Sequence, residues 1–408
     1  MRILHVTHQY APAIGGSEQY ITQLSEEMAR RGHTVSVFTS RSVDYRTWAD
    51  TLPRHEVRNG VSITRFTALP RRGATWRMLD MGLRNYDAGP AWLWEPLIWY
   101  GNGPVMPGLY PSIRRHAQEF DLVHISQLHY AHAWPAFRAA KSAGLPIVMT
   151  PHLHAEQRET YDVGYMRNIL RGSDAVIAVT RAEKAFIQRQ KLSARVIVGG
   201  NSLQLSEFPL QDGRAARHAF GLPEDAFVVL FLGRKTGYKG LDKVLTAFRT
   251  LYGLRENVYL LAVGAETDES RRLWAEQGAL PGVIVRDAVS NAERLAALAA
   301  CDVLAMPSTG EAFGIVYLEA WAYGKPVIGA DIQAVAALIN DGVNGFIIDP
   351  TRPAALAARL AQLADDPPLA AAMGAQGHAE LLARYTLARQ GDIVENLYRR
   401  VIRHGGSA

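Results

Sequence analysis

Two glutamates eight residues apart lie in a segment whose composition suits the binding of a diphosphate group. Val303–Met306 predicts a buried strand, and the run Phe313-Gly314-Ile315-Val316 predicts the start of a helix that contains Glu319. The free N–H groups and the dipole at a helix start bind phosphate without a special side chain, and Gly314 lets a ligand approach the backbone closely. Glu311 would face the group attached to the diphosphate, and Glu319 could accept hydrogen bonds from ribose hydroxyls. The alternative is an ordinary strand–helix turn whose glutamates face water.

A basic cluster follows an earlier apolar run and could hold the same phosphates. Phe227–Leu232 predicts a strand that leads into Gly233-Arg234-Lys235-Thr236-Gly237-Tyr238-Lys239-Gly240. A strand end followed by glycines and cations is a place to bind phosphate, although the spacing is not that of a P-loop. Arg234 and Lys239 could neutralise a departing diphosphate directly. A solvated basic turn is the alternative.

The first half of the chain offers weaker signals. The turn at Gly15-Gly16 is not a GxGxxG motif, but it could admit a ligand close to the backbone. Four histidines lie around the ends of two predicted strands, and any single one of them is more often structural than functional: His124, His129, His152 and His154. Without a cysteine partner or an HExxH motif, zinc has little support. The chain also lacks an Asp-x-Asp motif for a divalent cation, so no metal site is expected.

The elements that must position these residues alternate between short apolar strands and amphipathic helices, which predicts parallel sheets covered on both faces. The first series of strands is Arg2–Thr7, Thr34–Phe38, Val61–Phe66, Leu122–Ile125, Ile147–Thr150 and Ala175–Val179. The second is Phe227–Leu232, Val258–Val263, Val283–Arg286, Val303–Met306, Val327–Gly329 and Gly345–Ile348. Two doubly wound domains are therefore expected, joined between Val198 and Phe208, with a ligand cleft outside the carboxyl ends of their strands.

The segment Arg71–Arg115 interrupts the first series. It holds four tryptophans and six arginines against three acids, and the tryptophans are Trp76, Trp92, Trp94 and Trp99. Tryptophan together with arginine suits a membrane interface or a ring-shaped ligand. A mobile lid, or a local apolar cluster that covers the sheet, is the alternative.

Composition sets broader limits. The 408 residues are 48% hydrophobic and 20% charged, which is typical of a soluble globular protein. A transmembrane helix is not expected, because no apolar run reaches 18 residues. The single cysteine, Cys301, excludes an intramolecular disulfide and fits a reducing cytoplasm. Residues 1–200 carry 24 Lys and Arg against 16 Asp and Glu. This basic excess indicates either an anionic partner, such as a membrane surface, or arginines scattered over a solvated surface. No motif for nucleic-acid binding accompanies the basic excess.

Taken together, these motifs make the chain similar to glycosyltransferase family 4. The strongest part is CDVLAMPSTGEAFGIVYLEAWAYGKPVI at 301–328, where Glu311 and Glu319 resemble the paired glutamates of the family. Further matches are Gly233-Arg234 with Lys239-Gly240, the turn Gly15-Gly16-Ser17-Glu18, and Thr150-Pro151-His152. The chain departs from the family at Asn201-Ser202-Leu203-Gln204, which replaces an Asn-Gly-Val-Asp turn.

The resemblance implies an α/β protein of the GT-B fold, with two tandem Rossmann-like doubly wound domains facing a central cleft. Residues 1–200 would form the acceptor-side domain, 201–385 the nucleotide-sugar donor domain, and 386–408 a helix that packs back on the first domain. It also implies a retaining transferase that moves a sugar from a UDP- or GDP-sugar to an acceptor hydroxyl without a metal or another cofactor, in the synthesis of polysaccharides or glycoconjugates. The acceptor would be a saccharide or a lipid-linked molecule, and the enzyme would be cytoplasmic or peripheral at the cytoplasmic face of a membrane.

Residue by residue, the resemblance assigns the leaving diphosphate to Gly233, Arg234, Lys239 and the N–H groups of Phe313 to Val316. Glu311 would hold the donor sugar, Glu319 the ribose, Gly15 and Gly16 the diphosphate from the first domain, and His152 the acceptor side. A sugar-nucleotide epimerase, a phosphorylase-like transferase and a non-catalytic sugar-nucleotide-binding protein remain as alternatives. An epimerase would turn over the sugar nucleotide without an acceptor, whereas a binding protein would show no turnover.

Overall fold

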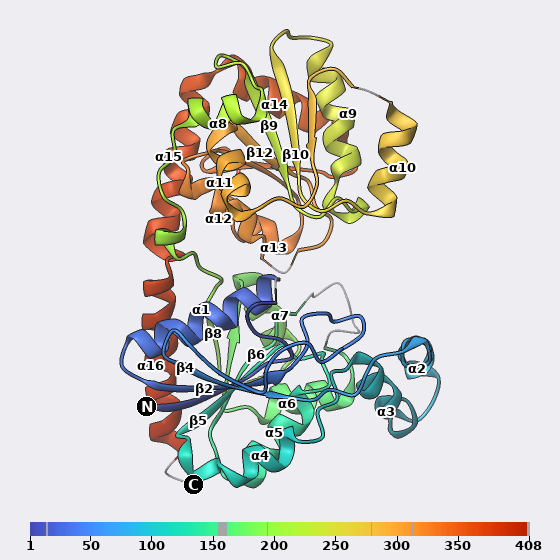
Figure 1. The fold of residues 1–408 in the computed structure, drawn as a ribbon, viewed down its shortest axis with the longest axis vertical. Coiled ribbons are helices and arrows are strands. Elements are labelled where there is room, and N and C mark those ends of the chain that lie inside the picture. Colours follow the sequence, from blue (N-terminus) through green and yellow to red (C-terminus); the bar gives the residue numbers. More distant parts are fainter. Residues whose placement is uncertain (14, 154–160, 194, 279, 312, 406–408) are drawn as a thin grey trace. The chain divides into compact units, whose positions relative to one another are not determined.

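A computed structural model describes residues 1–13, 15–153, 161–193, 195–278, 280–311 and 313–405. The chain divides into two compact units (Figure 1). The first unit comprises Met1–Asn201 and Leu387–Ala408, and the second comprises Ser202–Thr386. The C-terminal helix α16 (Leu387–Gly405) therefore belongs to the first unit, although the whole second unit precedes it in the chain.

Within the described residues, the first unit is built on an eight-stranded sheet in the order β3-β4-β2-β1-β5-β6-β7-β8. The strands are β1 (Arg2–Val6), β2 (Thr34–Ser40), β3 (His55–Arg58), β4 (Val61–Phe66), β5 (Leu122–Ser126), β6 (Ile147–Thr150), β7 (Ala175–Ala178) and β8 (Val196–Val198). All neighbours are parallel except β3 and β4. The strand order reverses between β1 and β5, so the carboxyl ends of these two strands form a topological switch point.

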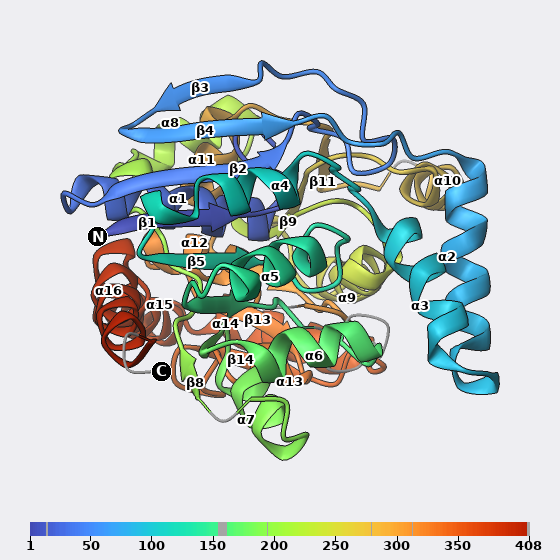
Figure 2. The same ribbon diagram turned by 90° about the horizontal axis from the view of Figure 1, so that it is seen from below.

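Helices cover both faces of this sheet (Figure 2). They are α1 (Gly16–Arg30), α2 (Gly73–Asn85), α3 (Ala91–Asn102), α4 (Leu109–Arg115), α5 (Ala133–Ser142), α6 (Gly164–Gly172), α7 (Arg181–Arg189) and α16. Helix α1 buries a stripe of Tyr20, Ile21, Leu24 and Met28 against one face, together with Val394 and Tyr398 of α16. It ends where Gly32 takes a φ of +84°, as a helix-stopping glycine does.

The second unit has, among the described residues, a six-stranded parallel sheet in the order β11-β10-β9-β12-β13-β14. Its strands are β9 (Phe227–Leu232), β10 (Val258–Val263), β11 (Val283–Arg286), β12 (Val303–Met306), β13 (Val327–Ala330) and β14 (Gly345–Ile348). Its helices are α8 (Gly213–Phe220), α9 (Leu241–Tyr252), α10 (Asp268–Gln277), α11 (Asn291–Ala300), α12 (Ile315–Ala322), α13 (Gln333–Ala336), α14 (Pro353–Asp365) and α15 (Pro367–Arg384). The switch point lies between β9 and β12, the two strands that precede the predicted phosphate-binding motifs. The expectation of two doubly wound α/β units is confirmed.

The Trp- and Arg-rich segment forms a helical hairpin rather than an irregular loop. Helices α2 and α3 lie side by side at the periphery of the first unit (Figure 2). They approach closely because Gly101 faces Leu79, whose Cβ lies only 2.6 Å from where a Cβ on Gly101 would be. The Trp99 indole donates a hydrogen bond of 2.7 Å to the carbonyl of Ala131, which ties α3 to the sheet domain. Among the described residues, no helix combines the length and apolar character needed to cross a membrane.

Candidate functional site

The two predicted phosphate-binding loops meet at the switch point of the second unit. The loop after β9 and the loop after β12 are neighbours because their strands pair in the sheet. The backbone N–H of Thr309 donates to the carbonyl of Tyr238 at 2.8 Å, which fastens one loop to the other. At Gly240, which has a φ of +81°, a Cβ would lie 2.6 Å from the carbonyl oxygen of Pro307. Only glycine fits this position, so the spacing of the motif serves the contact between the loops.

The predicted catalytic cations differ in their surroundings. Lys239 Nζ lies 2.5 Å from Glu311 Oε1, and both side chains are mostly buried. Arg234 is exposed, and within the described part of the chain its guanidinium has no hydrogen-bond or ion-pair partner. The site therefore presents one uncompensated cation and one cation that a carboxylate already balances. An entering diphosphate would meet Arg234 first, and it would draw Lys239 away from Glu311.

Gly314 shapes the start of α12, the predicted anion-binding end of this helix. It adopts a φ of +90°, and a Cβ there would lie 2.6 Å from the ring of Tyr317. Helix α12 starts at the next residue, Ile315, so the N–H groups of Ile315 and Val316 belong to its first turn, where helices leave such groups unsatisfied. Phe313 is buried, and its ring packs edge-to-face on Tyr385 with 5.8 Å between the ring centroids. Ala312, inside this motif, lies outside the described residues.

Glu319 stands in the second turn of α12 and pairs with a residue that the sequence motifs did not indicate. Its Oε2 lies 2.7 Å from Arg294 Nη1, on α11. Burial raises the pKa of Glu319, and the charge of Arg294 partly offsets this increase. The capping box formed by Ser290 and Glu293 marks the start of α11, which is the signal that could have placed Arg294 near the carboxyl edge of the sheet.

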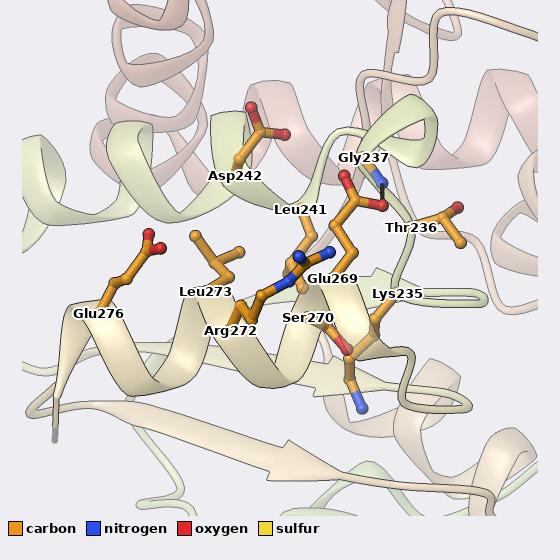
Figure 3. Close-up of a pocket in the computed structure, with 10 residues that line it drawn as sticks. All are labelled: Lys235, Thr236, Gly237, Leu241, Asp242, Glu269, Ser270, Arg272, Leu273 and Glu276. Atoms are coloured by element: carbon orange, nitrogen blue, oxygen red, sulfur yellow. Dashed lines mark hydrogen bonds between the residues drawn. The ribbon is translucent and has the colours of Figure 1, made fainter.

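Lys235, in the same basic cluster, supports the loop from behind. Its fully buried ammonium lies 2.6 Å from Glu266 Oε1 and donates to the backbone carbonyls of Gly264 and Arg286. Glu269 accepts a hydrogen bond from the N–H of Gly237 at 2.8 Å (Figure 3). The hollow drawn in Figure 3 lies between this loop and α10. Arg234, Lys239 and Glu311 do not line it, so it is separate from the candidate donor site.

In the first unit, the glycine turn is shaped by a carboxylate. Gly15 caps α1 and Gly16 begins it. A Cβ on Gly15 would lie 2.1 Å from Glu18 Oε2, so this glycine makes room for Glu18. Glu18 Oε1 lies 2.9 Å from His8 Nε2, and the His8 ring stacks on Tyr130 with 3.9 Å between centroids. Burial alone would raise the pKa of Glu18, but the hydrogen bond and charge of His8 outweigh it and lower the pKa to about 2.

His8 and Tyr130 were not among the candidates, because a single histidine after a strand carries no motif. His8 follows β1 and Tyr130 follows β5, so both lie beyond the strands that flank the switch point of the first unit. Of the predicted histidines, His129 lies beside Tyr130, with 4.1 Å between ring centroids. The neighbouring His132 donates from Nε2 to the carbonyl of Ser126 at 2.8 Å.

His152 follows β6 and has an uncommon backbone conformation for a non-glycine residue, with a φ of +53°. Its Nε2 lies 3.3 Å from Ser126 Oγ, and its ring meets that of Tyr20 edge-on with 5.1 Å between centroids. The N–H of the next residue, Leu153, donates to Glu183 Oε1 at 2.7 Å. Burial raises the pKa of Glu183 to about 7. His154 lies outside the described residues.

His124 lies in the core of the first unit, within β5. It is fully buried, and burial lowers its pKa well below the usual value for histidine. In the part of the chain that the structure describes, no three His, Cys, Asp or Glu side chains are grouped so that they could hold a metal ion.

Two family profiles match the chain in tandem. The profile described as Glycosyltransferase Family 4 matches residues 14–203, and the profile described as Glycosyl transferases group 1 matches residues 212–380. Similar proteins of known name include a D-inositol 3-phosphate glycosyltransferase of Streptomyces avermitilis, which is 30% identical over 95% of this chain and 85% of the relative. A protein of the same name from Segniliparus rotundus is 28% identical over 97% of this chain and 86% of the relative.

Solved structures share the fold. Sucrose-phosphate synthase from Thermosynechococcus elongatus superposes with a TM-score of 0.73 at 20% identity, over 99% of this chain and 100% of that one. The HepE protein of Anabaena, solved with UDP and glucose, superposes with a TM-score of 0.71 at 22% identity, over 97% of this chain and 99% of that one. These structures show the GT-B fold, and the sequence matches go further: the chain belongs to glycosyltransferase family 4 and is a glycosyltransferase.

Proposed function

We propose that this glycosyltransferase transfers a sugar from a nucleotide-sugar donor to an acceptor hydroxyl, with retention of the anomeric configuration and without a metal ion. The observation that carries the proposal is the meeting of two charged motifs at one switch point: the unpaired Arg234, the Lys239–Glu311 pair and the start of α12. A nucleoside diphosphate needs cations and N–H groups on its phosphates and carboxylates on its hydroxyls.

The difficult step is departure of the diphosphate while positive charge develops at the anomeric carbon. Stabilising this leaving group is expected to be the largest catalytic contribution. Arg234, Lys239 and the N–H groups of residues 313–316 would supply it. Glu311, freed from Lys239 by the incoming phosphate, would accept hydrogen bonds from the sugar hydroxyls. Glu319, held by Arg294, would accept them from the ribose.

The remaining roles follow the family resemblance. The acceptor hydroxyl would attack from the face that the diphosphate leaves, and the leaving phosphate would take its proton. The first unit would contribute Gly15 and Gly16 toward the diphosphate and His152 toward the acceptor. Because His152 sits next to the buried Ser126, its ring is positioned by the sheet rather than by solvent.

A UDP- or GDP-sugar is the proposed donor, and a saccharide or lipid-linked molecule in polysaccharide or glycoconjugate synthesis the proposed acceptor. The structure of the HepE neighbour contains UDP, which supports the first class of donor. The relatives named D-inositol 3-phosphate glycosyltransferase add a phosphorylated inositol to the acceptors worth testing.

A thermal-shift panel of UDP-, GDP- and ADP-sugars tests the donor, because a ligand that binds only the native state raises Tm. The selected donor is then incubated with and without acceptors, and the product is analysed by NMR for anomeric configuration. We expect transfer with retention. Conversion of the donor to an isomer without any acceptor would favour an epimerase, and binding without turnover would favour a binding protein.

We also propose a peripheral association with the cytoplasmic face of an anionic membrane through the α2–α3 hairpin. Apolar side chains are exposed on it, with Trp92 at 75% and Trp76 at 42% of their full exposure. Arg72, Arg77 and Arg84 are exposed on the same hairpin. Cosedimentation with anionic vesicles should weaken in Trp92→Ser but not in Leu210→Ser, which removes an even more exposed apolar side chain from the second unit. Equal binding of both variants would contradict this role of the hairpin.

A further inference from the structure

A line of buried polar side chains runs between the first sheet and the helices α1 and α16. His5 of β1 and His124 of β5 are paired neighbours in the sheet, and their rings meet edge-on with 5.2 Å between centroids. Tyr398 of α16 contacts both rings, with its hydroxyl 3.0 Å from His5 Nε2 and 2.5 Å from His124 Nδ1. Ser25 extends the line at one end, and Thr150 with Tyr20 extends it at the other.

The hydroxyl of Ser25 determines which ring nitrogen of His5 carries the proton. Ser25 donates its only hydroxyl proton to the carbonyl of Ile21 at 2.6 Å. Its oxygen can therefore only accept from His5 Nδ1, which lies 2.7 Å away and must carry a proton. Burial lowers the pKa of His5 to about 3, so the ring is neutral and Nε2 carries no proton. It follows that the Tyr398 hydroxyl donates to His5 Nε2.

The same reasoning determines the direction of the hydrogen bonds from Tyr398 to Tyr20. Because Tyr398 has no second proton, its oxygen accepts from His124 Nδ1–H. His124 is neutral as well, since burial lowers its pKa, so its Nε2 accepts the hydroxyl proton of Thr150 at 2.8 Å. Thr150 has then donated its proton, and its oxygen accepts from the Tyr20 hydroxyl at 3.3 Å.

Six hydrogen bonds thus point in one direction, from Tyr20 through Thr150, His124, Tyr398, His5 and Ser25 to the carbonyl of Ile21. The line begins and ends on α1 and passes through α16 at its midpoint. Hydrogen bonds in such a buried series polarise one another, and an interruption leaves buried groups unsatisfied.

We propose that Tyr398 and His124 are positioning residues for the acceptor side of the site, because their directed hydrogen-bond chain orients the Thr150 hydroxyl and the Tyr20 ring beside His152. Thr150 is two residues from His152, and the Tyr20 ring packs on the imidazole of His152. The C-terminal helix therefore supports this side of the site without touching a substrate. The kinetic consequence rests on the proposed function, whereas the direction of the chain does not.

Ring-¹⁵N histidine NMR at pH 7 tests the direction of the hydrogen-bond chain. Signals of His5 and His124 are assigned by their loss in His5→Gln and His124→Gln. Both rings should be neutral with the proton on Nδ1, and His124 should keep this tautomer in Thr150→Val, because Tyr398 still requires the Nδ1 proton. A proton on Nε2 of either ring in the unaltered protein would contradict the proposed direction of the hydrogen-bond chain, whether or not the protein proves to be a transferase of this kind.

Transfer kinetics test the positioning role. Tyr398→Phe should lower kcat by about tenfold through misplacement of the acceptor side, while the donor-induced Tm shift stays unchanged because the charged residues assigned to the donor lie in the second unit. Tyr165→Phe, which removes a buried hydroxyl on the opposite face of the sheet, is the matched control and should keep its kcat. A kcat for Tyr398→Phe within twofold of the control would overturn the proposal.

Thr150→Val interrupts the hydrogen-bond chain nearer its other end with a side chain of nearly the same shape. This variant replaces Tyr398→Phe as the kinetic test if Tyr398→Phe does not fold. It should lower kcat by a similar factor with the donor-induced Tm shift retained. Full activity in Thr150→Val would overturn the positioning role. Absence of transfer in the unaltered protein with every donor and acceptor would instead count against the proposed function, and the NMR result would still decide the chain.

Discussion

Lys239 and Glu311, 72 residues apart in the chain, form an ion pair of 2.5 Å where the loops after β9 and β12 meet. The pair holds the proposed catalytic cation and the proposed sugar-binding carboxylate in place before a ligand arrives. A diphosphate can therefore exchange partners with it, rather than having to organise two separate side chains.

Removal of either donor-site cation should impair catalysis more than folding. Arg234→Ala and Lys239→Ala are each expected to lower kcat by roughly a hundredfold, because each removes stabilisation of the departing diphosphate. Steady-state kinetics with the selected donor measure the effect, and circular dichroism checks the fold. Lys243→Ala, which removes a lysine of α9 outside the site, is the matched control. Near-normal turnover in both site variants would refute the assignment.

A methyl group at Gly314 should destabilise the second unit. Gly314→Ala places a Cβ at a φ of +90° and 2.6 Å from the ring of Tyr317, so we expect a loss of about 1–3 kcal/mol in the free energy of unfolding. Urea denaturation measures this quantity. Gly253→Ala, at a φ of −69° where a Cβ would make only ordinary van der Waals contacts, should be neutral or slightly stabilising. Equal stability of the two variants would mean that α12 begins differently.

Loss of Arg294 should weaken nucleotide binding. In Arg294→Gln the buried Glu319 loses the counter-charge of Arg294, so its already raised pKa should increase further, which favours the protonated carboxyl. A protonated carboxyl accepts fewer hydrogen bonds from ribose, and the donor KM should rise, more at low pH than at high pH. Arg272→Gln, on the exposed side of α10, is the control. A pH-independent KM in Arg294→Gln would argue against this coupling.

Glu183 should make folding depend on pH in a direction opposite to most carboxylates. Burial raises its pKa from 4.5 to about 7, so the native state binds its proton more tightly than the unfolded state. The contribution of Glu183 to the free energy of unfolding is therefore fully present below pH 4.5. About 3 kcal/mol of it is lost as the pH rises to about 7. Buried histidines such as His5 act in the opposite direction, since their pKa values are lowered.

The test is therefore the difference in unfolding free energy between the unaltered protein and Glu183→Gln, measured by urea denaturation from pH 4.5 to 7.5. As the pH rises, the unfolding free energy of the unaltered protein should fall relative to that of Glu183→Gln. A difference that stays constant across the range would show that Glu183 titrates normally.

Cys301 should be inert in the native protein. It is fully buried, and burial raises the pKa of its thiol to about 12, so almost no thiolate is available. Labelling with a thiol-reactive disulfide should be slow under native conditions and should reach one thiol per chain in denaturant. Rapid native labelling would indicate that α11 opens from the sheet.

Many elements could be placed from local pattern. The strands β4, β6, β9, β10, β11, β12 and β14 have the predicted bounds. Most of them are short apolar runs bounded by turns, as is typical of parallel strands, whereas β4 alternates buried and more exposed residues. The edge strand β3 was missed, since most of its residues are exposed, and β8 was missed because it has only three residues. The helices α2 and α3 were not predicted, because the prolines and glycines of this segment mask helices that are held together by contacts such as Gly101 with Leu79.

What the sequence by itself determined is the second unit: its strands, the motifs that follow β9 and β12, and through them the family. These signals are local, because a phosphate site made of backbone and short loops is written in consecutive residues. The tertiary structure alone decided the partners: Arg294 for Glu319, His8 for Glu18, and Tyr398 for His5 and His124. Such pairs join residues up to 393 positions apart, and their geometry depends on sheet order and helix packing, which no local pattern encodes.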